Sequence, residues 1–64
     1  MKAYSSREII KLIEEDGWFF IGTRGSHNYF KHPTKPGKVT VPHPRKSFPP
    51  KTQESILKDA GIKG

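Results

Sequence analysis

The residues most able to do chemistry in this chain lie near its middle, around the tripeptide Gly25-Ser26-His27. The imidazole of His27 can take up and release a proton near neutral pH, which suits a general acid or base. Between Gly17 and Gln53 the chain has seven Lys or Arg residues and no Asp or Glu. Such a basic segment favours a polyanionic partner, because each neutralised phosphate releases condensed counterions. A solvated basic surface with no partner fits the same charge run.

The composition argues against a metal site and against a catalytic triad. The chain has no cysteine, and its central segment has no carboxylate that would complete a metal shell or orient an imidazole. We therefore interpret Ser26 as a turn hydroxyl rather than a nucleophile. No metal and no other cofactor is expected.

Strand periodicity selects the neighbours of His27. In a strand over residues 27–31, alternate side chains point to opposite faces. Phe30 is the most apolar of these residues, so its face is expected to meet the core. That arrangement leaves His27, Tyr29 and Lys31 facing solvent or a ligand.

These residue types suit metal-free cleavage of RNA. A histidine base would deprotonate a ribose 2′-OH, which would attack the adjacent phosphate and leave a 2′,3′-cyclic phosphate and a 5′-hydroxyl. DNA lacks the 2′-OH and should resist. Tyr29 would stack a base and Lys31 would hold a phosphate. The other candidate RNA contacts, inferred from charge and position, are Arg24, Lys35, Lys38, Arg45 and Lys46.

The other two histidines, His32 and His43, are interpreted as structural or as lying at the edge of the site. Neither the attacking group nor the proton donor to the leaving oxygen follows from the sequence. His32, Tyr29 and Lys31 are all candidates for the proton donor.

The element that precedes this segment is predicted to be a helix over residues 5–16. Ser5 and Glu8 have the spacing of a capping box, and apolar residues then recur every three or four positions. Gly17 is well placed to end the helix in a left-handed conformation.

Three short strands are predicted over residues 18–23, 27–31 and 38–41, with turn residues between them and prolines after the third. A second helix is predicted after Phe48-Pro49-Pro50; its apolar stripe is Gln53, Ile56, Leu57 and Ala60, and Gly61 closes it. Two helices on one face of a three-stranded antiparallel sheet would leave the other face free for a ligand.

With 64 residues, the chain has room for one domain, taken here as residues 1–64. No apolar run approaches the ~20 residues that span a bilayer, and the N-terminus lacks a secretory signal, so a cytoplasmic location is expected. The expected core is Ile9, Ile10, Leu12, Ile13, Trp18, Phe19, Phe20, Ile21, Phe30, Val39, Val41, Phe48, Ile56, Leu57 and Ala60.

A succession of short motifs across residues 5–62 resembles the HicA family of toxins. Each motif is weak alone, but the ordered set is specific: Ser6-Arg7-Glu8-Ile9-Ile10-Lys11-Leu12-Ile13, Asp16-Gly17-Trp18, Arg24-Gly25-Ser26-His27, Phe30-Lys31-His32-Pro33, Val39-Thr40-Val41-Pro42-His43 and Ser55-Ile56-Leu57-Lys58-Asp59-Ala60-Gly61. One departure is that Lys51-Thr52 stands where many relatives have Gly-Thr at the start of the last helix.

The resemblance implies an α+β fold like that of double-stranded-RNA-binding domains, with the order α-β-β-β-α. It also implies a ribosome-independent mRNA endoribonuclease that arrests translation and is blocked by a HicB-type antitoxin covering the active face. The family's catalytic histidine falls on His27, and Gly25 and Ser26 match the motif positions that shape its turn.

Two other functions use the same features. A non-catalytic module would grip double-stranded RNA by its shape and would not depend on His27. A protein-binding adaptor would show no RNA affinity and no dependence on salt.

Overall fold

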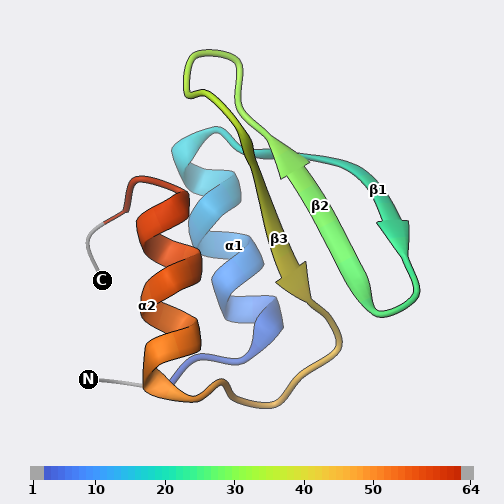
Figure 1. The fold of residues 1–64 in the computed structure, drawn as a ribbon, viewed down its shortest axis with the longest axis vertical. Helices are drawn as coiled ribbons and strands as arrows, with labels where there is room; N and C mark the ends of the chain where they lie inside the picture. Colours follow the sequence, from blue (N-terminus) through green and yellow to red (C-terminus); the bar gives the residue numbers. More distant parts are fainter. Residues whose placement is uncertain (1–2, 63–64) are drawn as a thin grey trace.

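Five regular elements follow one another in the order helix, three strands, helix (Figure 1). The structure is a computed structural model and describes residues 3–62. The elements are α1 (Ser6–Asp16), β1 (Phe19–Arg24), β2 (His27–Lys31), β3 (Lys38–Pro42) and α2 (Pro50–Asp59). The α-β-β-β-α order and the three-stranded antiparallel sheet confirm the predicted fold class.

Helix α1 has the predicted caps at both ends. The Ser5 hydroxyl accepts a hydrogen bond from the backbone N–H of Glu8, and the Glu8 carboxylate accepts one from the N–H of Ser5. These two bonds satisfy backbone donors that the first turn would otherwise leave free. At the other end Gly17 has φ 114°, so the chain turns sharply from the helix toward β1.

The sheet order is β1-β2-β3, and both neighbouring pairs are antiparallel. The register between β1 and β2 shifts between Phe20 and Gly22, which leaves Ile21 as the extra residue of a β-bulge. Strand β3 continues through Pro42, one residue further than predicted. Its proline lies at the strand end on an outer strand, where a missing N–H is tolerated.

The core lies between one face of the sheet and the two helices, which stand side by side (Figure 1). Its buried side chains are Ile9, Ile13, Trp18, Phe30, Val39, Val41, Phe48, Ile56, Leu57 and Ala60. Gln53 is also buried on the apolar stripe of α2, and its side-chain oxygen accepts the N–H of Tyr4 at 2.7 Å.

The prediction that β1 supplies core residues was wrong. Phe19, Phe20 and Ile21 are about half exposed, at 49%, 52% and 47%. The helices pack against β3, whereas β1 is the edge strand on the far side of β2 and carries the bulge. Phe20 contacts the core residue Phe30 edge-on, at 5.9 Å between ring centroids. Ile10 and Leu12, also predicted for the core, are partly buried at its margin.

Candidate active site

The sheet face opposite the helices carries three rows of aligned residues. The cross-strand pairs place Arg24, His27 and Pro42 in one row, Gly22, Tyr29 and Thr40 in the next, and Phe19, Lys31 and Lys38 in the third. Phe30 lies on the other face and is 1% exposed, as its apolar character predicts. The structure therefore places His27, Tyr29 and Lys31 on one open face, together with Arg24 and Lys38.

His27 begins β2 directly after a tight turn. Gly25 has φ 59°, a conformation that costs glycine little, and the Thr23 hydroxyl donates to the backbone oxygen of His27 at 3.1 Å. On the other side, the backbone N–H of His43 donates to the oxygen of Ser26 at 2.7 Å. The turn is thus fixed to both β1 and the end of β3, and this holds the backbone of His27 in place.

The His27 side chain is exposed, and within residues 3–62 nothing hydrogen-bonds to its ring. In its row, His27 lies between Arg24, across the β1–β2 ladder, and Pro42, across the β2–β3 ladder. An imidazole in this position is free to exchange a proton with a bound molecule, and the adjacent guanidinium can stabilise negative charge.

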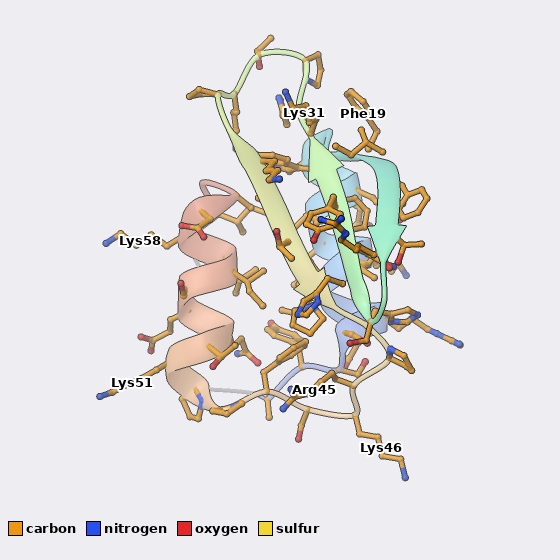
Figure 2. The ribbon with its side chains drawn as sticks, turned by 45° about the vertical axis from the view of Figure 1, so that its right-hand side comes forward. Phe19, Lys31, Arg45, Lys46, Lys51 and Lys58 are labelled. Atoms are coloured by element: carbon orange, nitrogen blue, oxygen red, sulfur yellow. The ribbon has the colours of Figure 1, made fainter. Side chains whose placement is uncertain are left out.

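Aromatic and basic side chains continue along the face. The Lys38 ammonium lies over the ring of Tyr29, at 4.8 Å from its centroid. Lys31 and Lys38 face each other across β2 and β3 at the opposite end of the sheet from His27. In Figure 2, Lys31 and Phe19 mark that end, and Arg45 and Lys46 lie at the other.

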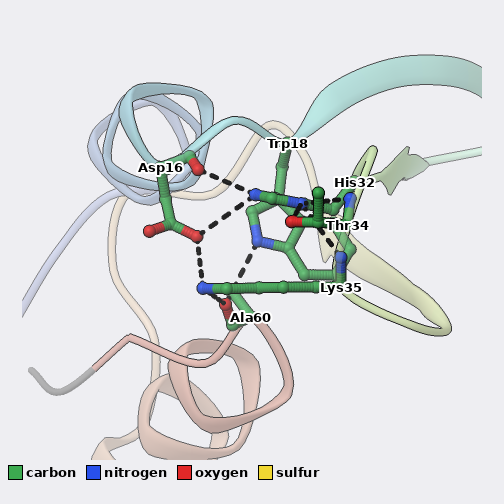
Figure 3. A network of polar contacts seen from close by, with 6 residues as sticks. All are labelled: Asp16, Trp18, His32, Thr34, Lys35 and Ala60. Carbon is green, nitrogen blue, oxygen red and sulfur yellow. Dashed lines mark hydrogen bonds and ion pairs between the residues drawn. The ribbon is translucent and has the colours of Figure 1, made fainter.

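Lys35 lies outside this face, in a polar network that joins three parts of the fold (Figure 3). Its ammonium donates to the carboxylate of Asp16 at the end of α1 and to the backbone oxygen of Ala60 after α2, the latter at 3.0 Å. A contact between Lys35 and RNA stays a prediction, and the ammonium of Lys35 already has two partners within the protein.

His32 belongs to the same network, and its hydrogen bonds define its tautomer. Its Nδ1 accepts the backbone N–H groups of Thr34 and Lys35 at 3.0 and 3.1 Å. The proton of a neutral ring must then sit on Nε2, which donates to the backbone oxygen of Asp16 at 2.8 Å. The ring also meets Trp18 edge-on. These contacts support the structural interpretation of His32.

The hydrogen bond from Lys35 lowers the pKa of Asp16 below its ordinary value of 3.8; the charge of Lys35 adds to this lowering, and desolvation opposes it. This carboxylate is consequently charged at neutral pH, and it binds Lys35 within the polar network, away from the open face. Among the described residues, no group of three or more His, Asp or Glu side chains is placed to hold a metal ion.

His43, Arg45 and Lys46 follow β3 at the end of the sheet that carries His27. Ser6, in the first turn of α1, is 1% exposed and connects to this segment through bonds to both His43 and Arg45. Sequence reasoning missed this connection and the neighbouring Arg7, because the partners are separated by 37 to 39 positions and no local pattern links them.

Comparison with known proteins agrees with the observed fold. Residues 6–62 match the model of a protein family described as HicA toxin of bacterial toxin-antitoxin. No curated protein matches the chain. A solved structure titled as a toxin-antitoxin complex from Streptococcus pneumoniae is similar, with 25% identity and a TM-score of 0.76, covering 91% of this chain and 97% of that chain. No helix within residues 3–62 is long and apolar enough to cross a membrane.

Proposed function

This chain belongs to the HicA family of toxin–antitoxin systems, and on that premise we propose that it is a metal-independent mRNA endoribonuclease with His27 as its catalytic histidine. The observation that carries the proposal is the placement of His27. Its ring is exposed on the open sheet face, is unbonded within residues 3–62, and lies directly across the ladder from Arg24.

In the proposed reaction, the His27 imidazole takes the proton of a ribose 2′-OH. The 2′ oxygen forms a bond to the adjacent phosphorus, and the bond from phosphorus to the 5′ oxygen of the next nucleotide breaks. The leaving oxygen gains a proton, which gives a 2′,3′-cyclic phosphate and a 5′-hydroxyl. Arg24 would stabilise the negative charge that develops on the phosphoryl oxygens.

Substrate binding is assigned to the rest of the same face and to the segment that follows β3. Tyr29 offers a ring for base stacking, and Lys31, Lys38, Arg45 and Lys46 offer charges for the backbone on both sides of His27. Gly25 and Ser26 shape the turn that presents the histidine. We leave Lys35 out of the proposed contacts, because Asp16 and Ala60 already hold its ammonium.

An antitoxin of the HicB type is the proposed protein partner. The similar solved structure is titled a toxin-antitoxin complex, and a partner that covered the open face would bury His27 and block access of RNA. The proposed mRNA substrate places the activity in the cytoplasm.

The test is cleavage of a defined RNA in EDTA by the wild type and by His27→Ala, with mapping of the product ends. We expect wild-type cleavage with cyclic-phosphate ends and a loss of at least ~10²-fold in the variant. His27 is exposed, so the variant should keep its fold by circular dichroism. Lys58→Ala, an exposed change on α2, serves as the control and should cleave normally.

A substrate with a single 2′-deoxy nucleotide at the mapped site separates the two possible nucleophiles. Resistance of that substrate supports attack by the 2′-OH, whereas continued cleavage would indicate attack by water. If the wild type binds RNA with steep salt dependence and never cuts it, the protein is an RNA-binding module instead of a nuclease.

A further inference from the structure

We propose that a basic pocket formed by Arg7, His43, Arg45 and Lys46 binds a backbone phosphate of the same RNA strand that reaches His27. This inference rests on the proposed function, which supplies the RNA substrate. It joins Arg45 and Lys46, which the proposed function already assigns to the substrate, with Arg7 of α1 and with His43 in one anchoring point beside the sheet.

The pocket is open, has a volume of about 510 Å³, and is lined by Ser5, Ser6, Arg7, His43, Pro44, Arg45 and Lys46. Three of these side chains carry a positive charge at neutral pH, and none is a carboxylate. Its volume accommodates a phosphate with part of the adjoining ribose. Such a group of cations without counter-charges repels itself, and binding of an anion would relieve that repulsion.

The fold holds the two sides of the pocket together through Ser6. The Ser6 backbone N–H donates to the oxygen of Arg45 at 2.9 Å, and the Arg45 N–H donates to the buried Ser6 hydroxyl, also at 2.9 Å. The guanidinium of Arg45 lies over the ring of Phe48, at 5.5 Å from its centroid. These bonds hold the start of α1 beside Arg45, so Arg7 and Arg45 line the same pocket although they lie far apart in the sequence.

His43 adds an imidazole ring to the lining, with two nitrogens that can form hydrogen bonds. Its Nδ1 lies 2.7 Å from the Ser6 hydroxyl, and within residues 3–62 its Nε2 has no partner. The Ser6 hydroxyl has one proton, which it can donate to Nδ1 of His43 or to the backbone oxygen of Arg45 at 3.2 Å. Where the shorter contact to Nδ1 receives it, the neutral ring carries its own proton on Nε2, where it can donate to a phosphate oxygen. Ser6 thus orients a ring whose second nitrogen remains available.

The position of the pocket favours the RNA backbone as the bound anion. Pro42 is the cross-strand partner of His27, and the next residue, His43, is bonded through its N–H to Ser26 in the turn before His27. The pocket therefore adjoins the turn that presents the proposed catalytic group. A nucleic-acid strand crossing the His27 row would meet it when leaving the sheet.

The first experiment measures binding of a short labelled single-stranded RNA by fluorescence anisotropy, with all proteins carrying His27→Ala to prevent cleavage. Adding Arg7→Ala and Lys46→Ala together is expected to weaken binding by about tenfold. The slope of log K against log salt should fall by about 0.7 for each phosphate that the variant no longer neutralises. Both side chains are exposed, so the fold should survive, as circular dichroism would verify.

Lys58→Ala is the matched control, because it removes one positive charge from α2, away from the end of the molecule that carries Arg45 and Lys46 (Figure 2). It should change affinity little. Arg7→Ala and Lys46→Ala are also measured singly. If Lys58→Ala weakened RNA binding as much as either of these single substitutions, only net charge would matter, and this would overturn the proposed pocket.

A second experiment separates this inference from the proposed function by using proteins with His27 intact. Arg7→Ala, at a residue outside the contacts assigned under the proposed function, should raise KM for the longer RNA much more than KM for a dinucleotide, since a dinucleotide is too short to reach both His27 and the pocket. Wild-type cleavage with an unchanged KM in the variant would reject the pocket and keep the nuclease. If the wild type never cleaved RNA but bound it in a way that depended on Arg7, the proposed pocket would stand and the proposed nuclease activity would be rejected.

A third outcome concerns the protein partner. If the pocket substitutions abolished antitoxin binding and left RNA affinity unchanged, these residues would belong to the antitoxin interface, and the inference would be overturned.

Discussion

Two histidines of this protein, His27 and His32, occupy the same strand region but have opposite surroundings. Both ring nitrogens of His32 are engaged, with the backbone of Asp16 on one side and that of Thr34 and Lys35 on the other. The His27 ring has no such partners within residues 3–62. A side chain that the fold does not use is free for chemistry, and this contrast supports the choice of His27 over His32 as the catalytic group.

Asp16 gives a prediction for stability against pH. We expect Asp16→Asn to unfold at lower urea concentration than the wild type at pH 7, because it replaces the charged carboxylate that accepts the Lys35 hydrogen bond with a neutral amide. The pKa of Asp16 is lower in the folded protein than in the unfolded chain, so its contribution exists above the unfolded pKa and is lost as pH falls through the folded pKa. Urea unfolding across a pH series should show the gap closing below about pH 4.

The control for this measurement is Asp59→Asn, which removes an exposed carboxylate that makes no ion pair within residues 3–62. If Asp59→Asn reproduced the same pH-dependent gap, general charge repulsion rather than the network around Asp16 would explain the effect.

The charge pattern of the sequence identified the basic segment, but it did not show which of its Lys and Arg residues lie on the open face. Lys35 and Lys38 are three positions apart, yet one binds Asp16 and the other lies over Tyr29 on the open face. Their roles differ because the partners come from α1 and β2, and a sequence does not show which distant residues will meet. The same reason hid Arg7 and Ser6 from the predicted site.

At the scale of elements, local signals predicted both helices, the three strands and the turn before His27. The capping box at Ser5, the glycine at position 17 and strand alternation around Phe30 all act over a few residues. The exposure of Phe19, Phe20 and Ile21 depends instead on which strands the helices cover. Strand composition carries no information on that point, and the predicted core was too large for this reason.

Gly17 provides a test of how α1 and the loop after β2 fit together. A Cβ at this position would come within 2.7 Å of Nε2 of His32, and the backbone has φ 114°. The short distance to His32 and the positive φ both make a Cβ at this position unfavourable. Gly17→Ala is therefore expected to lower the free energy of unfolding by at least about 1 kcal/mol in a denaturant titration.

Gly22→Ala is the matched comparison for Gly17→Ala. A Cβ at Gly22 has no atom within 4 Å, and the residue lacks a positive φ. This variant should stay within about 0.5 kcal/mol of the wild type. Similar decreases in stability at the two positions would contradict the close approach of His32 to Gly17.

At the scale of the whole molecule, the fold divides its two sheet faces between two tasks. One face is packed against α1 and α2 and contains the core, whereas the other carries His27, Tyr29 and the aligned basic side chains. The net charge of +6 has its main source in the segment that forms this open face and its margins. Attraction to a nucleic-acid backbone is therefore a property of one side of the protein.

This arrangement predicts that DNA binds but is not cut. The basic side chains can bind phosphates of either RNA or DNA, whereas the proposed reaction requires a ribose 2′-OH. A single-stranded DNA of the same sequence should therefore inhibit RNA cleavage competitively and remain intact. Its inhibition constant should rise steeply with salt, by about 0.7 log units per log unit of salt for each phosphate neutralised. Cleavage assays with DNA competitor across a salt series measure both effects. If DNA failed to compete even at low salt, the open face would bind RNA through its ribose hydroxyls and not through its phosphates. The electrostatic explanation of substrate binding would then be wrong.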